Sequence, residues 1–420
     1  MLLSFSCSNY RSIKEKIKFS MCATADQEHQ EQVKKVDSIR VLRNTAIYGA
    51  NGSGKSSFIS AIKSMQEMVV QSMKKQPGDA LERTSHKLSD IDVPTSFEMQ
   101  FVTDNIRFLY GFSYTEFEIK EEYLYYYPNG RQSKIFDRDE KGITFGKSFE
   151  KDLALVVEKM LKSNRLLLSI AANFTNISEI EKVFLFLKED IVVYQNSLGQ
   201  HGLDQHWIRL TAKALNESEK IKKIFLDFLK YIGSDAKDIY ARYEKKKLSM
   251  DALPTDFPLE LKEKIVEVGK EEIDLKIEYD KFTLNVSEES EGIKKLFKIL
   301  VPIFNVLVLG KTIIFDEIET SLHPSIVREI INLFINDRHE EFAQLIFSTH
   351  DAMLLNLQMF RRDQIWFTEL KGEERSTDLY SLAEIKNVRK DENIMKGYIH
   401  GKYGAIPMIN REIADIFDKE

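Results

Sequence analysis

The sequence has little cysteine and no excess of basic charge, and each shortage excludes a class of protein. Its two cysteines, Cys7 and Cys22, lie close to the N-terminus in no metal-ligand spacing. They are too few for a disulfide-stapled domain, and they suit a reduced compartment. The formal net charge of -6 differs from that of a strongly basic nucleic-acid binder. Any contact with nucleic acid would therefore need a local basic patch.

Long hydrophobic runs are also missing. The most apolar stretch, residues 296–309, is interrupted by Lys298 and Pro302 and is too short to span a bilayer. The first seven residues have no basic leader and are cut short by polar residues, so we interpret them as a strand rather than a signal peptide. We therefore expect a cytoplasmic protein that makes no membrane contact. Hydrophobic residues make up 43% of the 420, which is ample for a core.

The N-terminal part shows no internal repeat and no low-complexity tract. A buried strand is predicted at 45–48, followed by a glycine loop and a helix over 55–73. Residues 74–94 lack periodicity and contain Pro77-Gly78, which predicts a loop. Short alternating strands are predicted from 95 to 149, with Pro128-Asn129-Gly130 as a hairpin turn.

The later part is predicted to be helical at first. Apolar residues recur at helical spacing over 151–189, and we expect a helical insertion over about 205–270. That insertion has no sustained heptad repeat, so no long coiled coil is predicted. From residue 292 onward, helices alternate with two apolar strands, 312–315 and 344–347, a pattern typical of a parallel sheet flanked by helices.

A glycine-rich loop lies between the first buried strand and its helix. Residues 49–56 read Gly-Ala-Asn-Gly-Ser-Gly-Lys-Ser, which matches the P-loop pattern. Glycines let backbone N–H groups surround phosphates, and the helix N-terminus adds a positive dipole. Lys55 is predicted to reach the β- and γ-phosphates, and Ser56 to bind Mg²⁺. The predicted nucleotide-binding residues of this segment are Gly49, Asn51, Gly52, Ser53, Gly54, Lys55, Ser56 and Ser57.

The strand at 312–315 ends in two carboxylates, Asp316 and Glu317. Beside a P-loop, the first carboxylate would hold Mg²⁺ and the second would act as general base toward water. Adjacent carboxylates alone are common, but a β-branched strand before them and a P-loop elsewhere make the pattern specific. Together these motifs supply the parts for nucleotide hydrolysis with Mg²⁺ as well as for binding, and no residue distinguishes ATP from GTP.

Three further sequence motifs follow the P-loop and lie on either side of the two carboxylates. Ser290-Glu291-Gly292 opens an apolar helix, residues 318–324 follow the two carboxylates, and His350 follows the strand at 344–347. By itself, Ser290 could be only a helix N-cap, and His350 could be only a structural residue.

The order of these motifs resembles that of ABC-type AAA ATPases. The wording of residues 9–12, 315–324 and 348–350 resembles the soluble branch that includes SMC-type repair ATPases, OLD-family proteins and abortive-infection ATPases. Residues 397–407 resemble the C-terminus of the RloA/AbiL-type ATPases. The resemblance covers nearly the whole chain and is weakest over 200–270.

The resemblance implies a dimer, or a higher homo-oligomer, that sandwiches two nucleotides. Ser290 and Gly292 would then face the γ-phosphate held by the partner's P-loop, and residues 319–321 would follow the dimer interface. His350 would contact the γ-phosphate, and Arg11 would approach the nucleotide. The family also carries a coupling glutamine, for which Gln100 and Gln195 are the two candidates.

The predicted fold class is α/β: an ABC-type P-loop ATPase head with a mainly parallel central sheet, an antiparallel β subdomain and a helical insertion. We divide the chain into an N-terminal ATPase lobe (1–94), the β subdomain (95–150), the insertion region (151–285) and a C-terminal ATPase lobe (286–420).

Three functions compete. The resemblance favours a sensor ATPase of a bacterial anti-phage, abortive-infection system that controls a separate effector, nuclease-like or toxin-like, of RloB type. A DNA-repair or chromosome ATPase is the alternative; the lysine runs at 74–75 and 245–247 could touch phosphates, although such runs are more often solvated surface. The nucleotide-binding subunit of a transporter is disfavoured by the Ser-Glu-Gly signature and the long insertion.

Overall fold

The computed structural model describes residues 1–195, 201–246, 270–389 and 392–407, together with positions 249, 259, 262 and 266. The chain forms two units. The first comprises Met1–Asn196, Val306–Thr320 and Val327–Glu420, and the second comprises Ser197–Asn305 and Ser321–Ile326. These units group the residues differently from the four predicted segments, whose identity as domains stays a prediction.

The first unit contains a six-stranded sheet that carries the predicted motifs. Its strand order is β11-β15-β16-β5-β17-β18, and every neighbouring pair is parallel except β17 and β18. The bounds are β11 Ile191–Tyr194, β15 Thr312–Phe315, β16 Gln344–Ser348, β5 Asn44–Gly49, β17 Ile365–Lys371 and β18 Ser376–Ser381. β5, β15 and β16 are buried along their whole length, as expected of inner parallel strands. The predicted, mainly parallel sheet is confirmed; the sequence reading did not include β11, β17 or β18.

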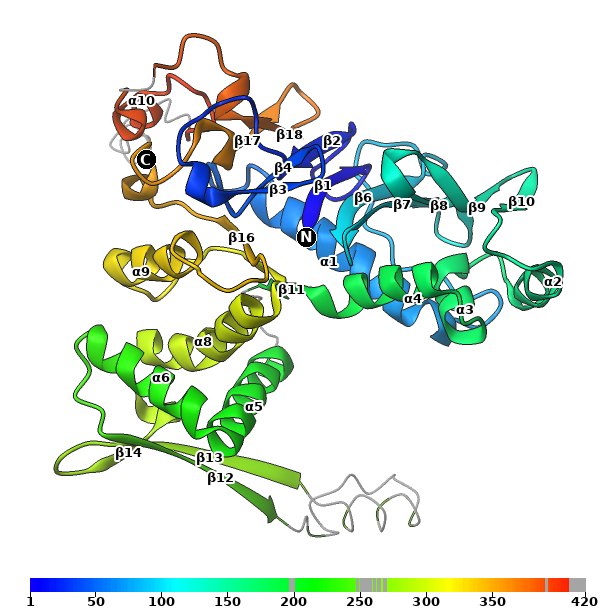
Figure 1. Ribbon diagram of the computed structural model, residues 1–420. Coiled ribbons are helices and arrows are strands. Elements are labelled where there is room, and N and C mark those ends of the chain that lie inside the picture. The colour runs from blue at the N-terminus through cyan, green and yellow to red at the C-terminus, as the bar shows by residue number, and fades with distance from the viewer. Residues whose placement is uncertain are drawn as a thin grey trace, which may run out of the picture. The chain divides into compact units, whose positions relative to one another are not determined.

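A seven-stranded antiparallel sheet is the second layer of this unit (Figure 1). Burial alternates along β6, where Phe97, Met99 and Phe101 are buried and the residues between them are partly exposed. The predicted hairpin turn at 128–130 joins β8 and β9 as a 3₁₀ turn. In sheet order the bounds are β10 Gly142–Phe145, β9 Ser133–Asp139, β8 Ile119–Tyr126, β7 Ile106–Tyr114, β6 Thr95–Thr103, β1 Leu2–Ser8 and β2 Ile17–Ser20; β3 Val33–Val36 pairs separately with β4 Ile39–Leu42.

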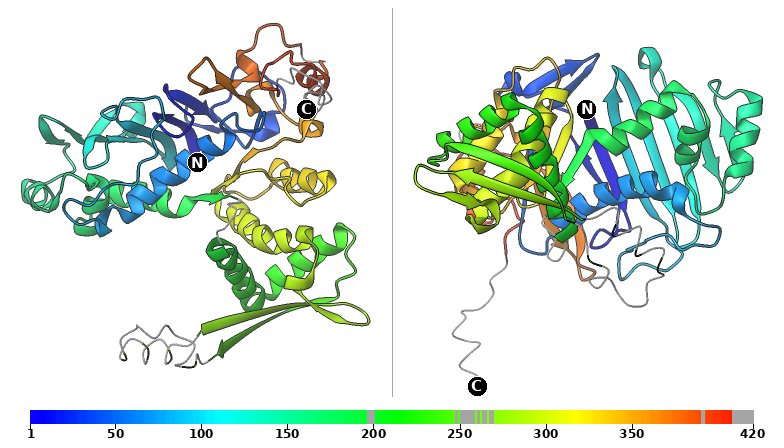
Figure 2. Two further views of the ribbon diagram at one scale, coloured as in Figure 1. Left: turned by 180° about the vertical axis from the view of Figure 1, so that it is seen from behind. Right: turned by 90° about the horizontal axis from the view of Figure 1, so that it is seen from below.

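Helix α1 (Lys55–Gln71) connects the two sheets through one core. Buried residues of α1, among them Phe58 and Ile62, belong to the same hydrophobic cluster as Phe5 and Phe97 of the antiparallel sheet and Ile314 of the central sheet. Figure 2 shows the antiparallel strands side by side with α1 against one face. Further helices with residues in this unit include α2 Lys151–Met160, α3 Leu167–Phe174, α4 Ser178–Leu185, α9 Pro324–Ile335 and α10 Ile394–Ile399, with a π-turn at Phe186–Asp190.

Short 3₁₀ turns connect these elements. They lie at Gln30–Gln32, Ser72–Lys74, Ala352–Leu354, Arg362–Gln364 and Leu382–Glu384, and in the second unit at Val286–Glu288.

The second unit corrects the prediction of a purely helical insertion over 205–270. Helices α5 (His201–Glu217) and α6 (Glu219–Tyr231) are followed by a three-stranded antiparallel sheet. Its strands are β12 Asp238–Lys246, β13 Lys270–Glu278 and β14 Thr283–Asn285, and α8 (Glu291–Leu309) comes next. Ile239, Leu275 and Ile277 are buried on these strands, and Leu275 and Ile277 show the two-residue period of a strand with one buried face.

Candidate nucleotide-binding site

Three of the predicted motifs lie at one edge of the central sheet. Because β11, β15, β16 and β5 run parallel, their carboxyl ends meet at that edge. β5 ends in the P-loop, β15 in Asp316 and Glu317, and β16 in the segment with His350. Two strands of this sheet, β11 and β16, are labelled in Figure 1. The fold therefore brings together side chains that lie about 300 positions apart in the sequence.

The P-loop needs glycine at position 54. Gly54 has a φ of 110° and precedes α1, and a Cβ there would lie 2.1 Å from Oγ1 of Thr377. Gly52 has a φ of 76°, with open space where a Cβ would be. Both glycines thus adopt the left-handed backbone that a phosphate cradle requires.

Small hydroxyl side chains on β17 and β18 hydrogen-bond the P-loop and hold it in place. Ser53 Oγ and Thr368 Oγ1 are 2.6 Å apart, and Thr377 Oγ1 donates to the carbonyl of Ser53 at 3.0 Å. The hydroxyl of Thr377 also bonds that of Ser12 at 2.8 Å, and Ser12 bonds Ser57 at the same distance. Ser57 is therefore a support of the loop, whereas Asn51 and Ser56 are exposed.

Lys55 is buried, and its ammonium group folds back onto the loop. Nζ donates to the carbonyl of Gly49 at 2.7 Å and to that of Ala50 at 3.2 Å. Burial lowers the pKa of Lys55 to about 8, although Glu317, Asp316 and Glu319 oppose that shift. A phosphate group would replace the carbonyl acceptors and favour the charged form of the lysine.

Ser348, the last residue of β16, hydrogen-bonds both Asp316 and Glu317, the two residues that follow β15. Its Oγ donates to Asp316 Oδ1 at 2.7 Å and accepts from the backbone N–H of Glu317 at 2.8 Å. Glu317 has a φ of 52°, which is uncommon for a residue with a side chain and is found preferentially at functional sites. Asp316 and Glu317 are both partly exposed and can meet a ligand.

His350 lies beside the candidate base. Its Nε2 is 3.7 Å from Oε1 of Glu317, and 34% of its side chain is exposed. Partial burial lowers the pKa of His350, Lys55 adds to this lowering, and the charges of Glu319, Glu317 and Asp316 oppose it. The imidazole and the carboxylate can therefore act on the same ligand atom.

These residues fit a nucleotide with Mg²⁺. Among the described residues, no three His, Cys, Asp or Glu side chains are grouped to hold a metal alone. Mg²⁺ commonly keeps waters and phosphate oxygens and takes only one or two protein ligands. Asp316 and the exposed Ser56 could supply those ligands, and this assignment stays a prediction.

Arg11 and Gln195 converge on one hydroxyl of α1. Arg11 Nη1 donates to Ser60 Oγ at 3.0 Å, and Gln195 Nε2 does so at 2.9 Å. Gln195 directly follows β11, the neighbour of the strand that carries Asp316, whereas Gln100 lies on β6 of the other sheet. The geometry therefore favours Gln195 over Gln100 as the coupling glutamine.

Ser290 and Gly292 belong to the second unit. Ser290 is exposed at the start of α8, and its Oγ accepts from the backbone N–H of Ile293 at 3.3 Å. A Cβ on Gly292 would lie 2.9 Å from the carbonyl oxygen of Ser321, so this glycine permits close packing.

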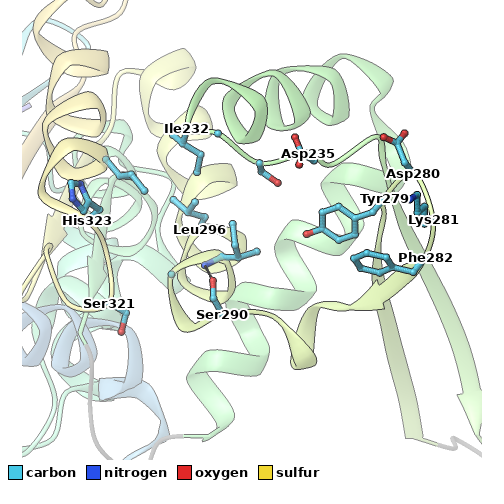
Figure 3. A pocket seen from close by; sticks show the side chains of 15 residues that line it. Ile232, Asp235, Tyr279, Asp280, Lys281, Phe282, Ser290, Leu296, Ser321 and His323 are labelled. Carbon is cyan, nitrogen blue, oxygen red and sulfur yellow. Dashed lines mark hydrogen bonds between the residues drawn. The ribbon is translucent and has the colours of Figure 1, made fainter.

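Both residues line a cavity of about 820 Å³ (Figure 3). Across it, Tyr279 and Phe282 stack with ring centroids 4.9 Å apart.

The sequence indicates Glu319 only along the dimer interface, and it does not indicate Ser348 or Ser60 as members of the site. The phrase Ser348-Thr349-His350 was noted for its histidine, and its serine could have been included because it ends the same strand. Ser60 lies four residues after Ser56, on the same face of α1. Glu319 Oε1 accepts from the backbone N–H of His350 at 2.5 Å, a contact that no local pattern indicates.

Comparison with known proteins identifies the family. Residues 45–173 and 206–356, more than half of the chain, match the family described as "AAA domain, putative AbiEii toxin, Type IV TA system". The chain belongs to this family of AAA-type P-loop ATPases. No curated protein sequence matches it.

Solved SMC heads are among the similar structures. An SmcHead bound to the C-winged helix domain of ScpA has 14% identity and a TM-score of 0.44, over 90% of this chain and 97% of that one. The SMC head domain from Thermotoga maritima has 14% identity and a TM-score of 0.41, over 90% and 98%. The Smc head with an extended coiled coil, bound to the C-terminal domain of ScpA derived from Pyrococcus furiosus, has 12% and 0.40, over 90% and 96%.

The predicted α/β P-loop ATPase head is confirmed. No helix in the described parts of the chain is long and apolar enough to cross a membrane.

Proposed function

We propose that this protein hydrolyses ATP, dimerises when ATP binds, and regulates a separate effector in a bacterial anti-phage system. The observation that carries the ATPase proposal is the convergence of Lys55, Asp316, Glu317 and His350 at one sheet edge, with Glu317 Oε1 3.7 Å from His350 Nε2. A site for binding alone would not need the base and the histidine together.

Each residue has a distinct task in this proposal. Lys55 and the loop N–H groups bind the β- and γ-phosphates, and Asp316 with Ser56 holds Mg²⁺, which would neutralise phosphate charge. Glu317 orients a water and accepts its proton, while its own backbone is held by Ser348. His350 contacts the γ-phosphate and responds to its loss.

ATP would close a dimer in which Ser290 and Gly292 of one subunit approach the γ-phosphate on the other. An exposed hydroxyl at the start of the 19-residue helix α8 is suited to this contact. Hydrolysis would remove the γ-phosphate and with it the contacts that favour the closed state.

The description of the matched family, with its toxin and type IV toxin–antitoxin system, supports an abortive-infection role. The residue pattern at 397–407 supports the RloA/AbiL-like branch, in which the effector is a separate chain of RloB type. The side chains of the lysine run at 245–247, on which the repair alternative would depend, lie outside the described residues.

The substitution Glu317→Gln tests the core of this proposal. It keeps the size of the side chain but removes the base, so we expect turnover to fall at least about 100-fold while ATP still binds. ATP and Mg²⁺ should then hold the variant as a dimer in light scattering, and the wild type should return to monomer as ATP is consumed. Glu340→Gln, an exposed change elsewhere, is the control. Unchanged turnover in Glu317→Gln would remove Glu317 from the role of base.

The same variant can identify the protein that the ATPase regulates. We expect affinity purification of ATP-bound Glu317→Gln from its native host to recover a nuclease-like or toxin-like partner, identified by mass spectrometry. Recovery of DNA with repair factors would instead favour the repair function, and recovery of permease subunits would favour transport.

A further inference from the structure

Glu319 links two loops of the candidate site. It lies two residues after Glu317, beyond the end of β15, and its Oε1 accepts from the backbone N–H of His350 at 2.5 Å. His350 follows β16, the parallel neighbour of β15. The carboxylate of one loop therefore holds the main chain of the other.

The neighbours of His350 are fixed by other bonds. The N–H of Thr349 donates to the carbonyl of Ile47 on β5 at 3.0 Å, and the N–H of Asp351 donates to Thr349 Oγ1 at 3.0 Å. The backbone N–H of His350 has only the carboxylate of Glu319 to accept it among the contacts described for this loop. The position of the imidazole beside Glu317 thus depends on Glu319.

Three polar side-chain atoms that the contact between Glu319 and His350 does not use lack a hydrogen-bond partner. Glu319 Oε2, Asp351 Oδ2 and the hydroxyl of Tyr48 are buried without a partner. Burial raises the pKa of Tyr48 well above its usual range, and the charges of Asp351 and Glu319 add to this rise. Buried polar groups without partners are rare, and each needs a physical reason.

We propose that Glu319 is a positioning residue for hydrolysis. It holds His350 beside Glu317 and so couples the loop 318–321 to His350. The inference rests on the proposed ATPase function. A positioning role differs from a purely stabilising role in one respect: the loss of turnover caused by substituting Glu319 must depend on His350.

Two substitutions at position 319 separate the acceptor from the charge. Glu319→Gln keeps an oxygen that can accept from His350 and puts an amide donor near Tyr48 and Asp351. We expect its kcat to stay within about threefold of wild type, whereas Glu319→Ala should lower kcat about tenfold or more with little change in KM for ATP. Glu158→Ala, on the exposed side of α2, is the matched control and should leave both constants unchanged.

A double variant tests the route through His350. If Glu319 acts by positioning the histidine, His350→Ala and the combination of both substitutions should lower kcat by nearly the same factor. Multiplied effects would mean that Glu319 acts independently and would overturn the inference.

A readout without turnover distinguishes failure of this inference from failure of the ATPase proposal. The histidine signals of selectively labelled protein can be followed by NMR as ATP and Mg²⁺ are added, with His350→Ala assigning the signal. Wild type and Glu319→Gln should show the same ATP-dependent shift, and Glu319→Ala a much reduced one. A full shift in Glu319→Ala, or a loss in Glu319→Gln equal to that in Glu319→Ala, would refute the positioning role even in a protein that does not hydrolyse ATP.

Discussion

Lys55 is buried, yet its proposed role in phosphate binding requires a positive charge. This has a measurable consequence for proton uptake. Its pKa of about 8 in the ligand-free site means that the lysine is partly neutral in mild alkali. Phosphate oxygens would favour the charged form and raise that pKa, so ATP binding must be accompanied by proton uptake above the ligand-free pKa.

Calorimetry can detect this proton. At about pH 8.5 we expect ATP binding to take up roughly half a proton or more, and at about pH 7 much less, because Lys55 is then already charged. Titrations in buffers of different ionisation enthalpy give the number directly. His350→Gln should keep the uptake, whereas equal uptake at the two pH values would show that another group is responsible.

Gly54 tests how closely the P-loop is fitted to its support. Gly54→Ala adds a side chain at a φ of 110° and a contact of 2.1 Å with Thr377. We expect a loss of about 2–4 kcal/mol in the free energy of unfolding, measured with urea. Gly78→Ala has a φ of 88° but open space, so it should cost only about 1 kcal/mol. Similar losses in both variants would mean that backbone strain alone determines the cost.

At the scale of elements, a buried carboxylate replaces the missing N-cap of α3. Leu166 at the cap position cannot accept a hydrogen bond through its side chain. Glu122 of β8 accepts from the backbone N–H of Leu167 at 2.5 Å and of Leu168 at 2.9 Å, and from the hydroxyl of Tyr110 at 3.0 Å. The antiparallel sheet thus stabilises the start of a helix that packs against it.

Removing this carboxylate should weaken the whole first unit. Glu122→Ala leaves two buried N–H groups and a hydroxyl without acceptors, so we expect the free energy of unfolding to fall by about 2–4 kcal/mol. The exposed neighbour Glu121 provides the matched control, Glu121→Ala, which should change stability by less than about 0.5 kcal/mol. Chemical denaturation followed by circular dichroism compares the two; a Glu122→Ala variant as stable as Glu121→Ala would remove the capping role.

Elements with a strong local signal were predictable, and elements defined by distant pairing were not. The P-loop and the strands at 312–315 and 344–347 follow from glycines and apolar runs, and the structure places them as expected. β11 is a run of only four residues after a helical region, and only its parallel pairing with β15 shows its place. The strands β12 and β13 lie in or next to the segment predicted to be helical, and their few apolar residues alternate among many charges, so the two-residue period is weak in the sequence.

The same distinction applies to the site. Lys55, Asp316 and Glu317 belong to continuous phrases with a known mechanism. The contacts of Ser348 with Asp316 and of Glu319 with His350 join residues 32 and 31 positions apart, across neighbouring strands. Such contacts depend on strand order, and strand order is set by the packed sheet as a whole.

For the whole molecule, the motifs of the proposed dimer site are divided between the two units. The P-loop, Asp316, Glu317 and His350 lie in the first unit, whereas Ser290 and Gly292 lie in the second. If a complete site needs the P-loop of one subunit and the signature of the other, defects in the two motifs must complement each other when carried by different chains.

Mixing two inactive variants tests this composite site. Lys55→Ala removes phosphate binding, and Ser290→Arg places a bulky charge at an exposed position where it should not disturb folding. In a mixed dimer, one site combines the intact P-loop of the Ser290→Arg chain with the intact signature of the Lys55→Ala chain. Equal mixing should therefore restore roughly a quarter of wild-type turnover, since about half of the dimers are mixed and each has one good site. If each chain used its own signature, every site would contain one defect and no activity would return, so the measurement decides between the two arrangements.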